Sequence, residues 1–130
     1  MKTVLGVVAG IVVAFLCVGG IEAIGHLIFP PPPDTDLTDP AQVARIMELA
    51  PPAAIAFVAL AWFVGALAGA FVADKIAGRA LAGWVVALLV LAGGVATMMM
   101  IPHPMWMWAI GIALPLIAGW LAQRLAKVAL

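Results

Sequence analysis

Four long apolar stretches, separated by short polar segments, dominate the pattern along the chain. They cover residues 3–29, 52–73, 80–101 and 105–126, and each has about the 20 apolar residues with which a helix spans a bilayer core. None shows the alternation of apolar and polar positions that a membrane barrel strand requires. Because backbone hydrogen bonds must be satisfied inside lipid, the stretches are predicted to be helices. The sequence therefore predicts an all-α membrane protein, with residues 1–130 forming one domain of four transmembrane helices.

The segments between the stretches predict how these helices are connected. Four prolines at positions 30–33 end the first helix, because proline lacks an amide donor, and an acidic loop follows over residues 34–39. Asp39, Pro40 and Gln42 match the start of a helix, so residues 40–50 are expected to form a short amphipathic helix that lies over the outer end as a lid. The polar turns 74–79 and 102–104 are short, and short turns join antiparallel neighbours. An up-down-up-down bundle is therefore expected.

The composition excludes several classes of protein. Hydrophobic residues make up 67% of the chain and charged residues 9%, whereas a soluble domain has about 45–50% and about 25%. The net charge is zero and there is no basic run, so nucleic acid is not an expected partner. Serine and tyrosine are absent, as are the phosphate-loop, CxxC and HExxH patterns. We therefore expect a protein that is not an enzyme, and the sequence points to no particular cofactor.

Positive charge is distributed unequally between the two sides of the predicted topology. Only Arg45 falls on the side of the acidic loop, and the other five cationic residues fall on the opposite side: Lys2, Lys75, Arg79, Arg124 and Lys127. Cytoplasmic loops of membrane proteins carry the excess of lysine and arginine. The pattern predicts a multi-pass protein of the bacterial inner membrane with both termini in the cytoplasm.

Small residues repeat every fourth position in two of the predicted helices. The second helix contains Ala61, Gly65, Gly69 and Ala73, and the fourth contains Ala118, Ala122 and Ala126. Such stripes let helix backbones approach closely, either within one chain or between chains, so a homo-oligomer or a membrane-protein partner stays open. Pro115 removes the usual hydrogen bond to the Gly111 carbonyl, which predicts a kink that is either static or a hinge.

The candidate chemistry lies at the outer rim. Glu22 is the one ionisable residue clearly inside a span, about 28 Å along its helix from Thr3. His26 follows one turn later on the same face, and His103 and Arg45 belong to outer segments that can converge on it. Three interpretations compete: a structural polar cluster, a cation or proton site for transport with His26 tuning Glu22, or a metal site of Glu22, His26 and His103.

Methionines near the outer turn offer a further ligand chemistry. Five of them fall in a stretch of ten residues: Met98, Met99, Met100, Met105 and Met107. Thioethers are soft ligands that suit Cu(I), but methionine is also a flexible apolar residue that fills gaps in cores. Three consecutive methionines point in different directions from a helix, so packing is the favoured interpretation.

The order of these motifs resembles a family of small, uncharacterised four-helix bacterial membrane proteins. The motifs are the proline-rich end of the first helix at 30–33, the acidic loop that follows, and the turn Ile101-Pro102-His103-Pro104-Met105-Trp106. The resemblance implies the four-helix fold and a bacterial inner membrane, and it implies no substrate.

Together, these patterns favour a structural or accessory membrane subunit that acts through helix packing. The main alternative is a small-solute or proton-coupled ion transporter that uses Glu22 with His26. Metal binding at the outer rim is the lesser alternative.

Overall fold

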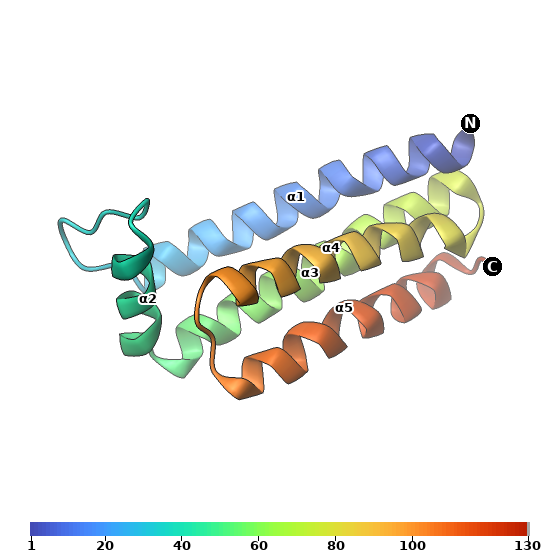
Figure 1. Cartoon of the computed structure of the whole chain (residues 1–130). Helices are drawn as coiled ribbons and strands as arrows, with labels where there is room; N and C mark the ends of the chain where they lie inside the picture. The colour runs from blue at the N-terminus through green and yellow to red at the C-terminus, as the bar shows by residue number, and fades with distance from the viewer. Residues whose placement is uncertain (130) are drawn as a thin grey trace.

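The computed structural model describes residues 1–129, which form five α-helices and no strand (Figure 1). The helices are α1 (Lys2–Ile28), α2 (Pro40–Leu49), α3 (Pro52–Ala77), α4 (Ala80–Met100) and α5 (Met105–Ala126). Four of them, all except α2, are long and apolar enough to cross a membrane. The all-helical architecture with four candidate membrane spans agrees with the pattern of apolar stretches.

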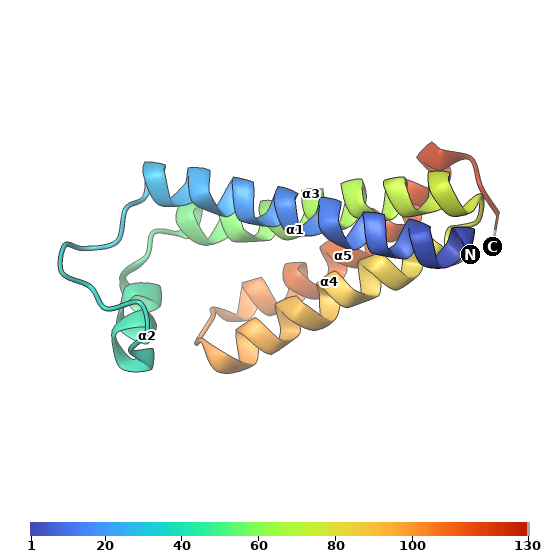
Figure 2. The ribbon, with the colours of Figure 1, turned by 90° about the horizontal axis from the view of Figure 1, so that it is seen from above.

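α3 lies at the centre of the bundle and packs against α1, α4 and α5. α1 also contacts α4 but does not reach α5, so much of its surface is uncovered. Both termini lie at one end of the bundle, which we call the terminal end, together with the turn at Gly78 and Arg79 (Figures 1 and 2). The opposite end, which we call the loop end, carries residues 29–51 and the turn 101–104.

α1 and α3 touch through their backbones at the terminal half of the bundle. A Cβ atom added to Gly10 would lie 2.5 Å from the Gly69 carbonyl oxygen, and one added to Gly69 would lie 2.6 Å from the Gly10 carbonyl oxygen. Gly6 faces the Ala73 carbonyl oxygen in the same way, at 2.7 Å. The stripe of Ala61, Gly65, Gly69 and Ala73 is buried throughout. These small residues therefore serve a contact within the chain.

The stripe of α5 is buried as well. Ala118, Ala122 and Ala126 are at most 3% exposed. Next to this stripe, Gly119 leaves room for the ring of Trp84 from α4, whose indole N–H donates a 3.1 Å hydrogen bond to Gln123 Oε1. The α4–α5 contact thus combines small residues with one polar link.

The structure corrects the predicted end of the second apolar helix. The turn was expected over residues 74–79, but α3 continues through Ala77 and ends at Gly78, whose φ of 71° is the left-handed conformation that glycine adopts without strain. Asp74 and Lys75 are therefore helical. The other bounds differ from the predicted ones by a single residue at one or both ends: helix 2–28 against 3–29, helix 40–49 against 40–50 and helix 80–100 against 80–101.

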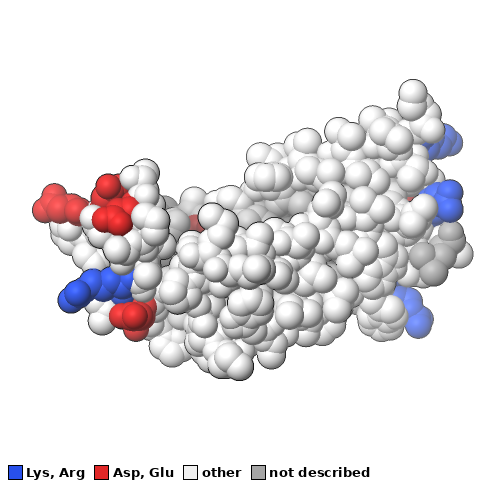
Figure 3. Space-filling view, in the orientation of Figure 1, with Lys and Arg blue, Asp and Glu red and all other residues white. Residues whose placement is uncertain are grey.

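Two apolar clusters follow one another along the bundle. At the terminal end, Ala14, Ala73, Ala82 and Val86 pack together. Towards the loop end, the core consists of larger side chains: Trp62, Met98 and Met107 pack in one cluster with Ile55 and Ala59. Charge is also divided between the ends, because basic side chains gather at the terminal end, and acidic ones gather around α2 and its loop (Figure 3).

Candidate functional site

The loop end contains a cavity of about 620 Å³ between α1, α3 and α4, with α2 and its preceding loop as the roof. Its walls are mostly apolar. The four polar residues that the sequence placed at the rim all line it: Glu22, His26, Arg45 and His103. The structure therefore brings these side chains, which come from α1, α2 and the 101–104 turn, to one cavity. This volume is within the range of about 300–1,000 Å³ found for small-molecule pockets.

The cavity exists because α2 does not pack closely on the bundle. No other helix within residues 1–129 approaches α2 closely, and no residue of α2 is fully buried. Its apolar face meets the core only through side chains such as Met47. The space between α2 and the long helices therefore stays open.

A polar network fixes where the roof helix begins. Asp39 Oδ1 accepts from the Ala41 N–H at 3.0 Å, which caps α2 as the sequence predicts. In a capping box, the side chain at the position of Gln42 would also accept from the Asp39 N–H, but that N–H donates to the Asp36 carbonyl oxygen at 3.2 Å. Instead, Gln42 Oε1 accepts from the Asp36 N–H at 2.8 Å, and its amide donates to Asp39 Oδ2 at 3.2 Å.

Asp36 anchors the loop that leads to α2. Its Oδ1 accepts from the Thr38 hydroxyl at 2.5 Å and from the Thr38 N–H at 2.9 Å. The Thr38 hydroxyl, with the backbone N–H as the second cause, holds the pKa of the Asp36 carboxyl below its ordinary value. The turn over residues 36–38 thus prefers the ionised carboxylate, and it loosens when the pH falls through that lowered pKa.

Glu22 is half-buried on the α1 side of the cavity. Its polar neighbours are the indole of Trp62 and the imidazole of His26. The two residues of α1 are thus close enough to interact, as their four-residue spacing predicts. His26 itself is exposed, so it lies towards the surface while Glu22 lies towards the core.

His103 approaches the same indole from the turn between α4 and α5. Its ring centroid lies 6.5 Å from that of Trp62, and its Nδ1 lies 2.6 Å from the Ile101 carbonyl oxygen. Because a carbonyl only accepts, Nδ1 carries the hydrogen in this contact. Nε2 is the nitrogen left to interact with anything in the cavity.

Trp62 links the polar side chains to the core. It is 5% exposed and lies against Gly94 of α4 and Gly111 of α5, where an added Cβ would come within 3.0 and 3.1 Å of the indole. The sequence alone did not place Trp62 beside Glu22 and His103. Trp62, Ala66 and Ala70 are spaced four residues apart and are all buried. This spacing is the signal that could have placed Trp62 on the buried face of α3.

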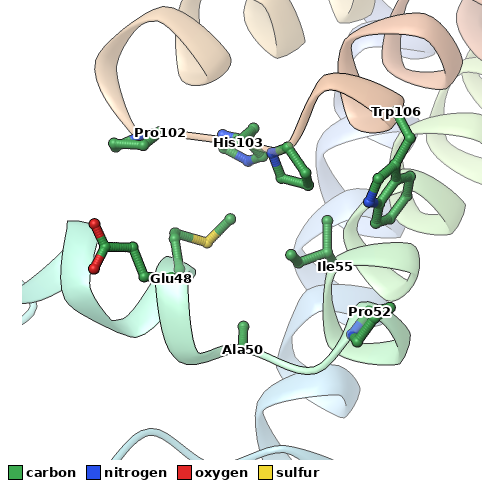
Figure 4. A pocket seen from close by; sticks show the side chains of 9 residues that line it. Glu48, Ala50, Pro52, Ile55, Pro102, His103 and Trp106 are labelled. Carbon is green, nitrogen blue, oxygen red and sulfur yellow. The ribbon is translucent and has the colours of Figure 1, made fainter.

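A second cavity of about 370 Å³ lies beside the first, between the end of α2 and the 101–104 turn. Figure 4 shows Glu48 and His103 on opposite sides of it, with Ile55 and Trp106 on the side nearest the long helices. His103 and Met47 line both cavities. The two cavities are therefore neighbours that share part of their lining, including His103.

The arrangement gives no support to a metal site. Within the described residues, no three His, Cys, Asp or Glu side chains gather closely enough to hold a metal ion. The methionines also diverge: Met98 and Met107 are buried in the core, whereas Met99, Met100 and Met105 are more than 70% exposed. They do not form one cluster of sulfur ligands.

The predicted hinge lies in packed surroundings. α5 is one continuous helix across Pro115, which is fully buried. Gly111 is close to the Met98 methyl and to Trp62. The pair thus takes part in packing here, and movement about it stays a prediction.

One carboxylate escaped the sequence prediction altogether. Asp74 is 1% exposed, and its Oδ1 accepts from the Gly83 N–H in the first turn of α4 at 2.7 Å. Oδ2 is buried without a hydrogen-bond partner within the described chain. Arg79 precedes α4 without a side-chain cap, so Asp74 supplies an acceptor where the helix dipole favours an anion. Asp74 continues the buried spacing of Trp62, Ala66 and Ala70, which is the signal that could have found it.

Comparison with known proteins leaves the assignment to the structure itself: no family model, curated protein or solved structure matches this chain.

Proposed function

We propose that this chain is a non-enzymatic, multi-pass protein of the bacterial inner membrane that binds a small solute at its outer end and acts in its transport. The observation that carries the proposal is the cavity of about 620 Å³ with Glu22 on its wall. Ionisable groups within membrane spans are rare and mostly mark solute or proton pathways. An apolar cavity with a few convergent polar groups is also the usual form of a small-molecule site.

In this proposal the chain crosses the membrane up-down-up-down, with both termini in the cytoplasm. The excess of lysine and arginine at the terminal end supports that orientation. The cavity then faces the periplasm, and α2 acts as its lid. His26 and His103 add two imidazole groups to the cavity that Glu22 lines.

A second candidate function is that of a structural or accessory subunit, which the uncovered face of α1 favours. Large apolar side chains cover this face, among them Val8, Val12, Phe15 and Leu16, each at least 53% exposed. Gly19 and Gly20 are exposed beside them, with nothing close to their added Cβ atoms. Such a face can be covered either by lipid or by a helix, which would come from a second copy of the chain or from a membrane-protein partner.

Native mass spectrometry of the protein, gently extracted from its own membrane, separates the two candidates. The transport proposal expects a monomer or homo-oligomer that carries a bound small molecule, and it expects Glu22→Gln to lose that molecule because the carboxylate is removed. The matched control is Asp34→Asn, which removes one negative charge at the same end but lies outside both cavities.

The opposite outcomes are equally clear. A fixed stoichiometry with another polypeptide, with no bound small molecule, makes the chain an accessory subunit. If the Glu22→Gln variant still carries the bound small molecule, Glu22 is not the solute-binding group.

A further inference from the structure

The walls of the larger cavity suit the apolar part of a ligand. Phe29 and Phe57 lie on its α1 and α3 sides, with ring centroids 6.4 Å apart in an edge-on arrangement. Ile46 and Met47 approach from α2, and Val58 from α3. A solute held here has most of its surface against hydrocarbon and aromatic rings. Aromatic faces also attract cations.

One side of the same cavity carries a carboxylate whose charge is not balanced. Glu22 is half-buried, and its polar neighbour Trp62 brings an indole N–H but no positive charge. His26 and Arg45 also line the cavity, but both side chains are exposed, so solvent screens the positive charge of Arg45. Within residues 1–129, no lysine or arginine side chain pairs with Glu22. A cation bound beside this carboxylate gains more than it does in water, because the surroundings are partly desolvated.

Charge around the cavity has the same sign as Glu22. The loop end holds five acidic residues and one cationic residue, Arg45; the five are Glu22, Asp34, Asp36, Asp39 and Glu48 (Figure 3). A surface with such an imbalance raises the local concentration of cations and repels anions. Charge and apolar lining thus select the same class of solute.

We infer that the larger cavity takes a monovalent organic cation with an apolar body, its positive centre beside Glu22 and its apolar groups against Phe29 and Phe57. This inference rests on the proposed solute-binding function and names the class of solute. Aromatic probes of similar size that carry a positive, a negative or no net charge test it directly.

The experiment uses the full chain in lipid nanodiscs and measures binding by isothermal titration calorimetry, with empty nanodiscs as the blank. The probes are tetraphenylphosphonium, tetraphenylborate and neutral triphenylphosphine oxide. Since these probes partition differently into lipid, the quantity compared is the affinity of each variant relative to wild type for the same probe.

The expected result is saturable tetraphenylphosphonium binding that weakens at least tenfold in Glu22→Gln. Asp34→Asn should change the affinity by less than about twofold, because an exposed charge is screened by salt. Glu22→Asp retains the charge and should keep most of the binding, which covers the case in which Glu22→Gln does not fold. Affinity for triphenylphosphine oxide should not depend on Glu22.

Two kinds of failure can be told apart. If the neutral or anionic probe binds saturably, but the cation shows no dependence on Glu22, the solute-binding function stands and the cation inference is wrong. If no probe binds saturably and native spectra contain only bulk lipid, both the inference and the proposed function fail.

Discussion

The terminal end and the loop end of this bundle are built from the same four long helices but pack in different ways. At the terminal end, Gly10 and Gly69 bring two backbones into contact, and Asp74 ties α3 to the first turn of α4. At the loop end, Trp62, Met98 and Met107 separate the helices, and a cavity opens beyond them. Dense packing at the terminal end thus provides a fixed base, while the loop end keeps an open cavity.

The sequence of α1 shows how one helix produces both ends. Along one face of α1, the side chains at every fourth position become larger from the terminal end towards the loop end. These positions are Gly6, Gly10, Ala14, Val18, Glu22 and His26. Small residues permit backbone contact, whereas larger or polar ones require space or a polar partner. The change from Ala14 to Val18 and Glu22 marks where close packing gives way to the cavity wall.

The largest expected effect is at the α1–α3 backbone contact. Gly10→Leu forces a side chain into the space next to the Gly69 carbonyl oxygen, where even a Cβ would lie at 2.5 Å. Backbone atoms cannot move aside cheaply, so we expect a loss at or beyond the upper end of the roughly 1–3 kcal/mol typical of overpacking. Thermal unfolding in detergent, followed by circular dichroism, measures it.

The matched control for this substitution is in the same helix. Gly19→Leu adds the same side chain at an exposed position with nothing within 4 Å of the added Cβ. Its melting temperature should stay near that of the wild type. Equal losses from the two variants would mean that the α1–α3 contact does not determine stability.

The next effect in size concerns Asp74. Asp74→Ala removes the acceptor from the Gly83 N–H and leaves a small void at a position that is 1% exposed. Breaking a buried hydrogen bond costs about 1–3 kcal/mol, so the melting temperature should fall clearly, although less than in Gly10→Leu. The comparison is with Lys75→Ala, an exposed neighbour that should change stability by no more than about 0.5 kcal/mol.

If Asp74→Ala and Lys75→Ala have the same melting temperature, the Asp74 carboxylate does not stabilise the first turn of α4. A second substitution checks the same contact from the other side. Gly83→Ala places a methyl group against the Asp74 carboxyl and should destabilise, whereas Gly93→Ala in the same helix meets open space and should not.

Much of this architecture could be predicted from the sequence, because it depends on local patterns. Length and hydropathy identified the four candidate spans, and the four-residue spacing of Gly65 and Gly69 identified a packing stripe. The charge of Glu22 inside an apolar run and its spacing to His26 selected two residues that line the larger cavity.

What escaped prediction depends on contacts between distant segments. Asp74 stands next to Lys75 near a glycine, which is typical of a solvated turn, and only the approach of Gly83 reveals its burial. The size of the cavity depends on how far α2 stands from the long helices, and amphipathicity alone does not determine that distance. The position of Trp62 beside Glu22 and His103 likewise depends on how α1, α3 and the 101–104 turn pack together.

The smallest expected effect is at the roof of the loop end, and it separates local from global stability. Asp39→Ala removes the side chain that caps α2, at a cost of about 0.5–2 kcal/mol to that helix. Because no residue of α2 is fully buried, the melting temperature of the bundle should hardly change. Hydrogen exchange of the Val43 and Ala44 amides should instead become faster, and Asp34→Asn, which removes a loop charge but no cap, should leave it unchanged. A fall in melting temperature as large as that of Asp74→Ala would mean that the roof unfolds together with the base, so that the two ends are one cooperative unit.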